Sequence, residues 1–321
     1  MNGSTAPRKP PKRTASVATA RPGGPPTDTL PADPGPPWRT IAEIVNLPIY
    51  REGVSPVSSG FAVLDDALRG GFRPESLYIL AGRTGSAKSS LVLNIARKVA
   101  LAGDGVLVFK LEESPTEAVW RIHAATAQVE LTRLLDGAQL ADDERQRLAD
   151  AEELIRTLPV CLSDRRNIRA IERLAQAFVG IRGRLVIIDQ LSMVDCADAP
   201  LGYERATAVS GHLRLLARDL HVPILLVCQV NRPASKTTEH LSCYDLRDSG
   251  ALENDAAAVM LIDRVRAADF RRQSADPLTL ELLIDKNRYG RTTRDVQPLE
   301  LRWWPQFCRI EDAAKPTAGD A

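Results

Sequence analysis

The sequence has little of what marks several protein classes. Its five cysteines are scattered with no CxxC pair, and its four histidines stand singly. This spacing argues against a zinc motif or a disulfide framework and is typical of a protein of the reducing cytoplasm. No apolar run approaches the roughly 20 residues that span a bilayer. The N-terminus lacks the apolar core of a secretory signal. We therefore expect a cytoplasmic protein with no membrane partner.

The net charge is also small, and aromatic residues are few. The chain has 42 Lys and Arg against 41 Asp and Glu, a formal charge of +1. No global field draws it to nucleic acid, so any such binding must come from local patches. Aromatic residues make up 5%, which gives no evident base-stacking platform. Apolar residues reach 44% of 321 residues, enough for the core of one large domain or two small ones.

Composition divides the chain into four parts. Residues 1–37 are basic and Pro-rich with few large apolar side chains, so we expect a disordered tail. Its basic residues are read as a solvated tail in preference to a non-specific nucleic-acid contact. Residues 38–52 are expected to be a linker with a short helix, residues 53–311 one folded domain, and residues 312–321 a second disordered tail.

Short apolar runs rich in Val, Ile and Leu alternate with helical patterns through the folded part. Such runs are typical of strands buried on both faces of a mostly parallel sheet. Right-handed crossovers then predict an α/β fold, a twisted sheet with helices on both faces. The runs are 77–81, 106–109, 185–188, 224–228, 259–262 and 280–284; the helices lie near 88–102, 115–127, 141–157, 167–179 and 204–220; segments 299–303 and 307–310 are predicted to form a C-terminal hairpin.

The first apolar run leads into a glycine-containing loop and a predicted helix, which is the context of a P-loop. Backbone N–H groups and the helix N-terminus bind phosphate, an exposed Lys88 reaches the β/γ-phosphates of ATP, and Ser89 binds Mg²⁺. Ala87 stands where the usual motif has glycine, and it costs about 1 kcal/mol if φ is positive there. A Gly/Ser turn before an ordinary helix is the less favoured alternative. The predicted nucleotide-binding residues are Gly82, Arg83, Thr84, Gly85, Ser86, Ala87, Lys88, Ser89 and Ser90.

Polar side chains follow three other predicted strands. Asp189 ends the run 185–188, where it can hold Mg²⁺ through water opposite Ser89. Glu112 follows 106–109 and is the preferred base for the attacking water, with Glu113 as the alternative. Gln229 follows 224–228 and can contact the γ-phosphate, although a satisfied buried amide fits the pattern equally.

Beyond these motifs, the chain from about 53 to 310 resembles the C-terminal RecA-like domain of DnaB-type hexameric helicases. The most diagnostic stretch is the block 246–255, LRDSGALEND, which generic P-loop proteins lack. The sequence departs from the family at Ala87 and at Lys110, which replaces a small residue. The other matching stretches are 59–61 with 64–65, the P-loop, 109–112, 187–189, 229–232 and 286–290.

The resemblance implies a RecA-like P-loop fold, ATP and Mg²⁺ as cofactors, and residue roles. It gives Glu112 the role of catalytic base and Gln229 that of γ-phosphate sensor. It makes Lys286 and Arg288 a basic finger that reaches the ATP of a neighbouring subunit. It further implies a self-assembled ring, a hexamer, with a loader or replisome protein as a further partner class.

The resemblance also implies that the loop 232–245 faces a channel occupied by single-stranded DNA. Its polar residues suit a phosphate backbone without reading sequence. An ordinary polar surface loop is the reading without the resemblance. The predicted DNA-binding residues are Arg232, Lys236, Thr237 and Thr238.

Two functions therefore compete. The first is an ATP-driven helicase motor that moves 5′→3′ on single-stranded DNA and unwinds duplex, with polarity and stoichiometry implied by the resemblance. The second is a RecA-like DNA-binding ATPase that acts as a regulator, repair factor or loader without unwinding. Finger residues favour a ring and basic loop residues favour DNA, so an unwinding assay separates the two.

Overall fold

The computed structural model of this chain describes residue 1 and residues 41–46, 55–136, 140–199, 202–230, 241–246, 249–265, 277–293 and 297–313. Most of the predicted tails, 1–37 and 312–321, lies outside these ranges. The chain separates into two compact units, Met1–Gly53 and Val54–Ala321. In the first unit the structure describes one short helix, α1 (Ile41–Val45). The second unit holds the sheet and the P-loop and is described below.

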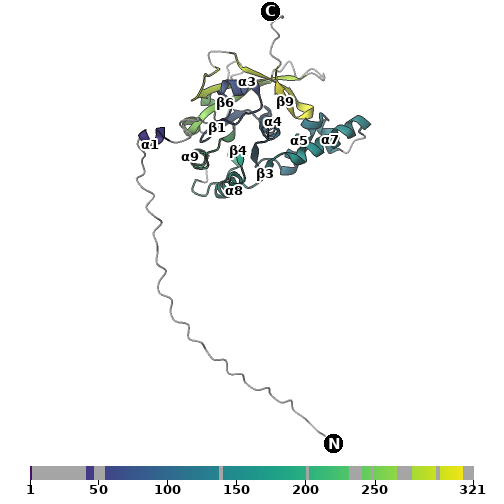
Figure 1. Cartoon of the computed structure of the whole chain (residues 1–321), viewed down its shortest axis with the longest axis horizontal. Helices are drawn as coiled ribbons and strands as arrows, with labels where there is room; N and C mark the ends of the chain where they lie inside the picture. Colours follow the sequence, from purple (N-terminus) through teal and green to yellow (C-terminus); the bar gives the residue numbers. More distant parts are fainter. Residues whose placement is uncertain are drawn as a thin grey trace, which may run out of the picture. The chain divides into compact units, whose positions relative to one another are not determined.

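A nine-stranded sheet forms the centre of the second unit (Figure 1). Its order is β3-β2-β4-β5-β1-β6-β7-β8-β9. Strands β3 to β6 in that order pair in parallel, whereas β7, β8 and β9 continue the sheet antiparallel. The strands are β1 (Leu77–Gly82), β2 (Gly105–Lys110), β3 (Val160–Ser163), β4 (Gly183–Asp189), β5 (Ile224–Gln229), β6 (Ala256–Val265), β7 (Leu278–Asn287), β8 (Leu299–Trp304) and β9 (Arg309–Asp312).

Helices cover both faces of this sheet. One core cluster joins α8 (Ile168–Gly180) and α9 (Gly202–Leu220) to residues such as Leu77, Ile79 and Ala81 of β1. The opposite cluster joins α3 (Ala62–Ala67) and α4 (Lys88–Leu101) to Tyr78 and Leu80. Because side chains alternate along a strand, burial on both faces produces the near-continuous apolar runs of the sequence. The predicted α/β fold with a mostly parallel sheet is confirmed.

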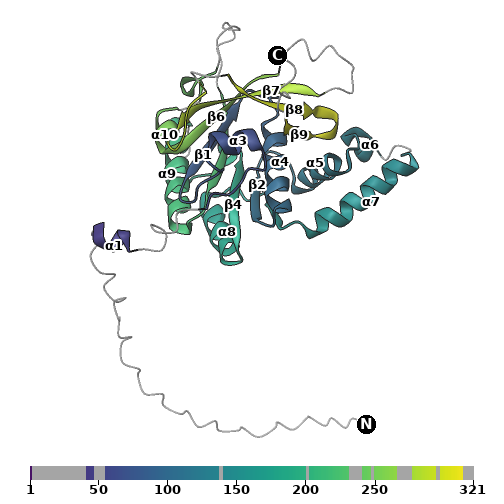
Figure 2. The ribbon, with the colours of Figure 1, turned by 45° about the horizontal axis from the view of Figure 1, so that its top comes forward.

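Three further helices lie beside the sheet. Figure 2 shows α5 (Pro115–Ala127), α6 (Leu131–Leu135) and α7 (Asp142–Thr157) grouped together. Helix α5 begins with a complete capping box, in which Ser114 accepts from the Glu117 N–H and Glu117 accepts from the Ser114 N–H. This cap fixes where the chain leaves β2 and enters α5. Among the helices of the described residues, none combines the length and apolar character that a bilayer crossing requires.

The structure departs from the predicted elements at the two edges of the sheet. Strand β3 was not predicted, because it has four residues and none of them is fully buried. Strand β7 runs antiparallel to β6, a direction that an apolar run does not encode. The last strand was predicted to begin at residue 307, which is wrong. A 3₁₀ turn spans Pro305–Phe307, and β9 begins at Arg309.

Candidate phosphate-binding site

The predicted P-loop connects β1 to α4 at the carboxyl edge of the sheet. Gly82 ends β1 and pairs with Gln229 of β5 and Ile262 of β6. A Cβ on Gly82 would lie 2.5 Å from the Ser86 Oγ, so only glycine leaves room for the turn that follows. The Ser86 N–H donates to the Arg83 carbonyl at 3.2 Å, which closes that turn. The Ser86 hydroxyl oxygen is buried with no protein partner, a polar group suited to a bound phosphate.

Ala87 adopts the left-handed conformation, with φ of 67° and ψ of 15°. The positive φ that causes backbone strain in a non-glycine residue is therefore present at this position. A non-glycine residue in this region costs about 1–2 kcal/mol. The residue is also buried, at 9% exposure, and it packs in the core cluster under α4.

We predict that Ala87→Gly keeps or raises ATP affinity, by up to about fivefold if 1 kcal/mol of strain is relieved on binding. Isothermal titration with a non-hydrolysable ATP analogue measures the affinity. Ala149→Gly is the matched control, because exposed Ala149 lies within α7, where glycine should instead lower stability by about 1 kcal/mol. A clear fall in ATP affinity for Ala87→Gly would show that the alanine methyl contributes to the nucleotide site.

Lys88, the first residue of α4, is not exposed as the sequence suggested. Its side chain is buried, and its Nζ donates to the carbonyls of Gly82 at 3.0 Å and Arg83 at 2.7 Å. Burial lowers its pKa, while the nearby carboxylates of Asp189 and Glu112 oppose that shift. The correction has a simple cause: the loop curls around the amine, so its own carbonyls solvate the charge. A phosphate can replace these carbonyls as the partner of the amine.

Asp189 ends β4 and lies directly beside Lys110 of β2, its register partner. Both side chains are fully buried, at 1% and 0% exposure, and the Lys110 Nζ lies 2.5 Å from the Asp189 Oδ2. The second carboxylate oxygen, Oδ1, is buried without a partner. Asp189 therefore carries one oxygen neutralised by a lysine and one buried oxygen without a protein partner, and it is not among the residues that line the cavity at the P-loop. The sequence flagged Lys110 as unusual but did not reveal this ion pair.

We predict that Lys110→Met lowers the free energy of unfolding by about 3–5 kcal/mol, because it leaves the Asp189 charge buried and unpaired. Urea unfolding at pH 7 without divalent metal measures the loss. The double variant Lys110→Met/Asp189→Asn should lose much less, since neither charge then remains. As a control, Arg156→Ala removes the exposed ion pair to Glu152 and should cost under about 0.5 kcal/mol. Equal losses for Lys110→Met and Arg156→Ala would contradict the buried pair.

The two candidate bases after β2 have different surroundings. Glu113 binds Arg121 of α5 at 2.9 Å and lies 3.4 Å from the Lys110 Nζ. Glu112 is exposed and faces the same cavity as the P-loop. The Glu113 carboxylate is held in place by two cations, whereas the exposed Glu112 carboxylate can approach a water molecule in the cavity. This difference favours Glu112 over Glu113 for activating water.

One cavity of about 320 Å³ brings most of the predicted nucleotide residues together. Gln229 reaches it from the end of β5, and Glu112 from the segment after β2. Arg121 of α5 and Trp303 of β8 also line it, and neither was predicted, because their placement depends on how α5 and the antiparallel strands pack. The lining residues are Thr84, Gly85, Ser86, Ala87, Lys88, Ser89, Ser90, Glu112, Glu113, Arg121, Gln229 and Trp303.

A larger cavity, of about 620 Å³, lies between β3 and α8. Leu107, Leu162 and Phe178 are among its lining residues, and it shares no lining residue with the cavity at the P-loop. Its largely apolar lining offers little to a phosphate. The smaller polar cavity is therefore the candidate site.

The finger residues do not reach the P-loop of their own chain. The Arg288 N–H donates to the carbonyl of Ala257, at the start of β6, whereas the P-loop follows the far end of β1. The rise along β1 from Leu77 to Gly82, at about 3.3 Å per residue, separates these ends by roughly 16 Å. An arginine side chain cannot cover that distance.

The two finger residues also differ from each other. The Lys286 Nζ donates to the carbonyls of Glu253 and Asn254 in α10 (Ser249–Asp255), at its C-terminal end, where a cation is favoured. Burial and the neighbouring Arg288 lower the pKa of Lys286. Arg288 is exposed, so it is the finger residue more available to another molecule.

The predicted DNA-binding residues Arg232, Lys236, Thr237 and Thr238 lie outside the described residues. Of the block 246–255, the structure describes Leu246 and the helix α10, which packs against α9. Asp255 there accepts from the Ser210 Oγ at 2.7 Å and pairs with Arg214 at 2.8 Å. In the described residues, this block therefore anchors α10 to α9.

Comparison with known proteins gives a family match that covers most of the chain. The family model of the DnaB-like helicase C terminal domain matches residues 56–312. The replicative DNA helicase DnaB of Treponema pallidum is 30% identical over 261 residues, which cover 79% of this chain and 55% of the relative. That of Leifsonia xyli is 30% identical over 267 residues, 80% of this chain and 56% of the relative. The chain thus spans about half the length of these curated relatives.

Solved structures show the same fold. One of them, described as an ATPase domain, superimposes with a TM-score of 0.75 at 21% identity, covering 85% of this chain and 99% of that chain. A DnaB-like replicative helicase, described with its interactions with primase, gives a TM-score of 0.72 at 22% identity and covers 85% and 66%. At such identities the likeness concerns the fold, which is the RecA-like ATPase fold predicted above.

Proposed function

This chain belongs to the family of the DnaB-like helicase C-terminal domain, and we propose that it is the ATP-hydrolysing motor of a cytoplasmic DNA helicase. In this proposal, copies of the chain assemble into a hexameric ring and hydrolyse ATP at the interfaces between neighbours. Hydrolysis drives movement 5′→3′ along single-stranded DNA and separates the duplex ahead. A loader or another replisome protein is the further partner that we propose.

A single observation carries the proposal: the P-loop, Glu112 and Gln229 converge on one polar cavity. The three come from the ends of β1, β2 and β5, which meet at the carboxyl edge of the parallel sheet. Gly85 and Ala87 both have positive φ. Loops of this kind are suited to presenting backbone N–H groups to an anion. Residues Gly82 to Ser90 then hold the triphosphate, with Lys88 on the β- and γ-phosphates.

The residues present also fit a magnesium ion. The buried, unpartnered Asp189 Oδ1 supports an oxygen ligand from β4, and Ser89 lies on the cavity side of α4. Hard oxygen donors are what Mg²⁺ prefers. We propose that Ser89 binds the ion directly and Asp189 binds it through water. When bound, the ion neutralises charge on the β- and γ-phosphates.

The other groups receive roles from their position. Glu112 takes the proton of the attacking water, and Gln229 contacts the γ-phosphate and passes its loss to the segment that follows β5. Arg121 and Trp303, which also line the cavity, add a positive charge and an aromatic surface for the nucleotide. Arg288, with Lys286 behind it, acts on the ATP of the neighbouring copy.

For DNA, we propose the loop after Gln229, with Arg232, Lys236, Thr237 and Thr238 on the phosphate backbone. The net charge of +1 leaves such a local patch as the means of attraction. Its position directly after the γ-phosphate sensor would couple hydrolysis to movement on the strand.

A second function is favoured by two features of the site. The strained Ala87 and the Lys110 pair at Asp189 both act against tight binding of nucleotide and metal. A DNA-binding ATPase that regulates, repairs or loads without unwinding would tolerate slow turnover. Strand separation distinguishes the two functions.

We predict that single-stranded DNA stimulates ATP hydrolysis and that Glu112→Gln lowers the stimulated rate by about 10²–10⁴-fold. Steady-state phosphate release with and without a single-stranded oligonucleotide measures both effects. Glu113→Gln is the matched control, since Glu113 is held by Arg121 and should alter the rate by a few-fold at most. A larger loss in Glu113→Gln than in Glu112→Gln would reassign the base.

A further inference from the structure

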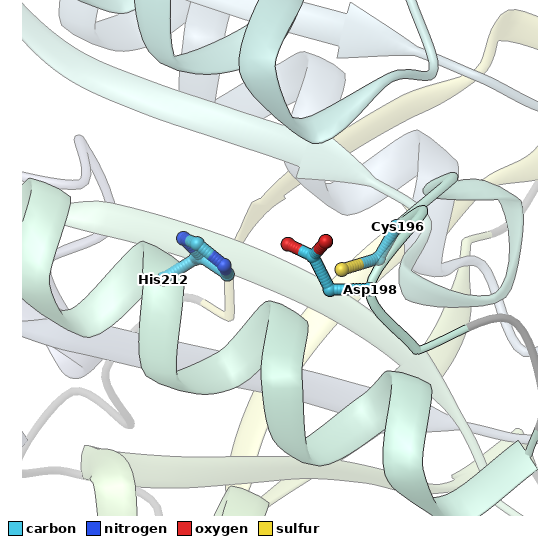
Figure 3. Close-up of side chains that lie close together, drawn as sticks. All are labelled: Cys196, Asp198 and His212. Atoms are coloured by element: carbon cyan, nitrogen blue, oxygen red, sulfur yellow. The ribbon is translucent and has the colours of Figure 1, made fainter.

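Three side chains with metal-binding chemistry lie together outside the cavity at the P-loop. They are Cys196, Asp198 and His212, and one potential ligand atom from each lies within 4.8 Å of the other two. Figure 3 shows the thiol and the carboxylate on one segment, with the imidazole projecting toward them from α9. None of the three lines the cavity at the P-loop.

The backbone holds the first two residues in a fixed turn. After β4 and a 3₁₀ turn at Leu191–Met193, the Asp195 N–H donates to the Arg166 carbonyl at 2.9 Å. The Ala199 N–H then donates to the Cys196 carbonyl at 3.2 Å, which closes a turn with Asp198 inside it. Cys196 is buried at 4% exposure. The thiol is thereby fixed beside α9 by the segment that follows Asp189.

A fourth residue orients the imidazole. The Glu172 Oε1 of α8 lies 3.0 Å from the His212 Nδ1, and both side chains are partly buried. A carboxylate on one ring nitrogen is the usual partner of a metal-binding histidine, because it fixes the tautomer and the ring plane. With Nδ1 donating to Glu172, Nε2 keeps its lone pair for a metal.

We propose that Cys196, Asp198 and His212 form a Zn²⁺ site, with Glu172 as the positioning residue for His212. A thiolate, an imidazole and a carboxylate together suit a borderline-soft divalent ion and not Mg²⁺. Three protein ligands leave a fourth tetrahedral position for water. On binding, the thiol of Cys196 loses its proton to the solvent.

The required adjustment is small. Zinc bonds of about 2.0–2.3 Å place tetrahedral donor atoms about 3.3–3.8 Å apart. The present spacing is at most 4.8 Å, so it must contract by no more than about 1.5 Å. Asp198 can supply this movement, since its side chain is 75% exposed. The spacing of the ligands in the sequence did not predict the site, because they come from a turn and a distant helix and contain no CxxC pair.

The site would join the segment after Asp189 to α9. Arg169 lies beside it, with its guanidinium 3.1 Å from Glu172 and 3.8 Å from Asp198. This guanidinium opposes a bound cation, so its removal should strengthen metal binding. The prediction separates a metal site from a structural ion-pair cluster, which removal of Arg169 would weaken.

The test uses the full, tag-free chain without nucleotide. After chelation, Co²⁺ should give the visible absorption of a tetrahedral ion and a thiolate charge-transfer band, and isothermal titration should give one Zn²⁺ per chain. Cys196→Ser and His212→Asn should each weaken Zn²⁺ binding more than tenfold, and Glu172→Gln by about 10–100-fold. Arg169→Ala should tighten it.

Cys161→Ser is the matched control, because Cys161 is exposed on β3. This variant should bind Zn²⁺ as tightly as the unmodified chain. Circular dichroism without metal checks that the Cys196→Ser variant folds. If this variant does not fold, His212→Asn still tests the site, because the His212 side chain is partly exposed. No saturable Zn²⁺ binding, or affinity unchanged in His212→Asn, would overturn the proposal.

Discussion

Lys88→Ala is expected to reduce ATP hydrolysis by at least about 10²–10³-fold while the fold survives. The Lys88 amine is held by two carbonyls of its own loop, next to the carboxylates of Asp189 and Glu112. In the proposed mechanism, phosphate replaces those carbonyls and the amine neutralises charge that builds up on the γ-phosphate. Alanine removes this charge at the position where the transition state needs it.

Because Lys88 is buried, the variant also loses hydrogen bonds that an exposed lysine would not have. We expect a modest stability loss of about 1–3 kcal/mol, and Lys88→Met keeps more of the packing. Phosphate release measures turnover, and circular dichroism with urea unfolding measures the fold. Arg173→Ala, at an exposed residue of α8, is the control for removal of a cation elsewhere. Turnover at the normal rate in well-folded Lys88→Ala would show that the P-loop has no part in hydrolysis.

Arg288→Ala is expected to lower the rate by about 10³–10⁵-fold, the range for an arginine delivered to a transferring phosphoryl group. The Arg288 backbone N–H is hydrogen-bonded to the start of β6, which lies beside the start of β1. The P-loop follows the other end of β1. The residue therefore cannot serve the P-loop of its own chain. In the proposed ring, any effect of Arg288 on hydrolysis therefore comes through a neighbouring copy.

Mixing two inactive variants, Lys88→Ala and Arg288→Ala, tests this directly. If subunits exchange, about a quarter of head-to-tail interfaces pair an intact P-loop with an intact Arg288, and a similar fraction of the activity should return. Labelled subunits confirm the exchange. A surface arginine with no such role would cost under about 0.5 kcal/mol and leave the rate unchanged. Confirmed exchange without any returning activity would place Arg288 outside the reaction and remove this support for a ring.

The sequence predicts the parts of the molecule that depend on local pattern. The strands around the P-loop are buried on both faces, so their apolar runs are unbroken, and the start of α5 is set by its own capping box. The resemblance of residues 246–255 to the DnaB-type helicases was also apparent from the sequence. Each of these features depends on residues close together in the chain.

What depends on register and packing was not predictable. Lys110 faces Asp189 only because β2 and β4 are adjacent with that register. Trp303 reaches the phosphate cavity because β7 and β8 extend the sheet antiparallel. Cys196 and His212 meet because α9 folds back along the sheet. Burial of Lys88 was missed for the same reason, since its partners are carbonyls that no side-chain motif encodes.

Strand separation on a forked duplex with a 5′ single-stranded tail tests the central claim most directly. Unwinding is followed beside DNA-stimulated hydrolysis, with ATP or a non-hydrolysable analogue, at protein concentrations that allow assembly. We predict ATP-dependent strand separation by the unmodified chain, none with the analogue, and none by Glu112→Gln. DNA-stimulated hydrolysis at full rate without any strand separation would contradict the helicase motor and favour the DNA-binding regulator.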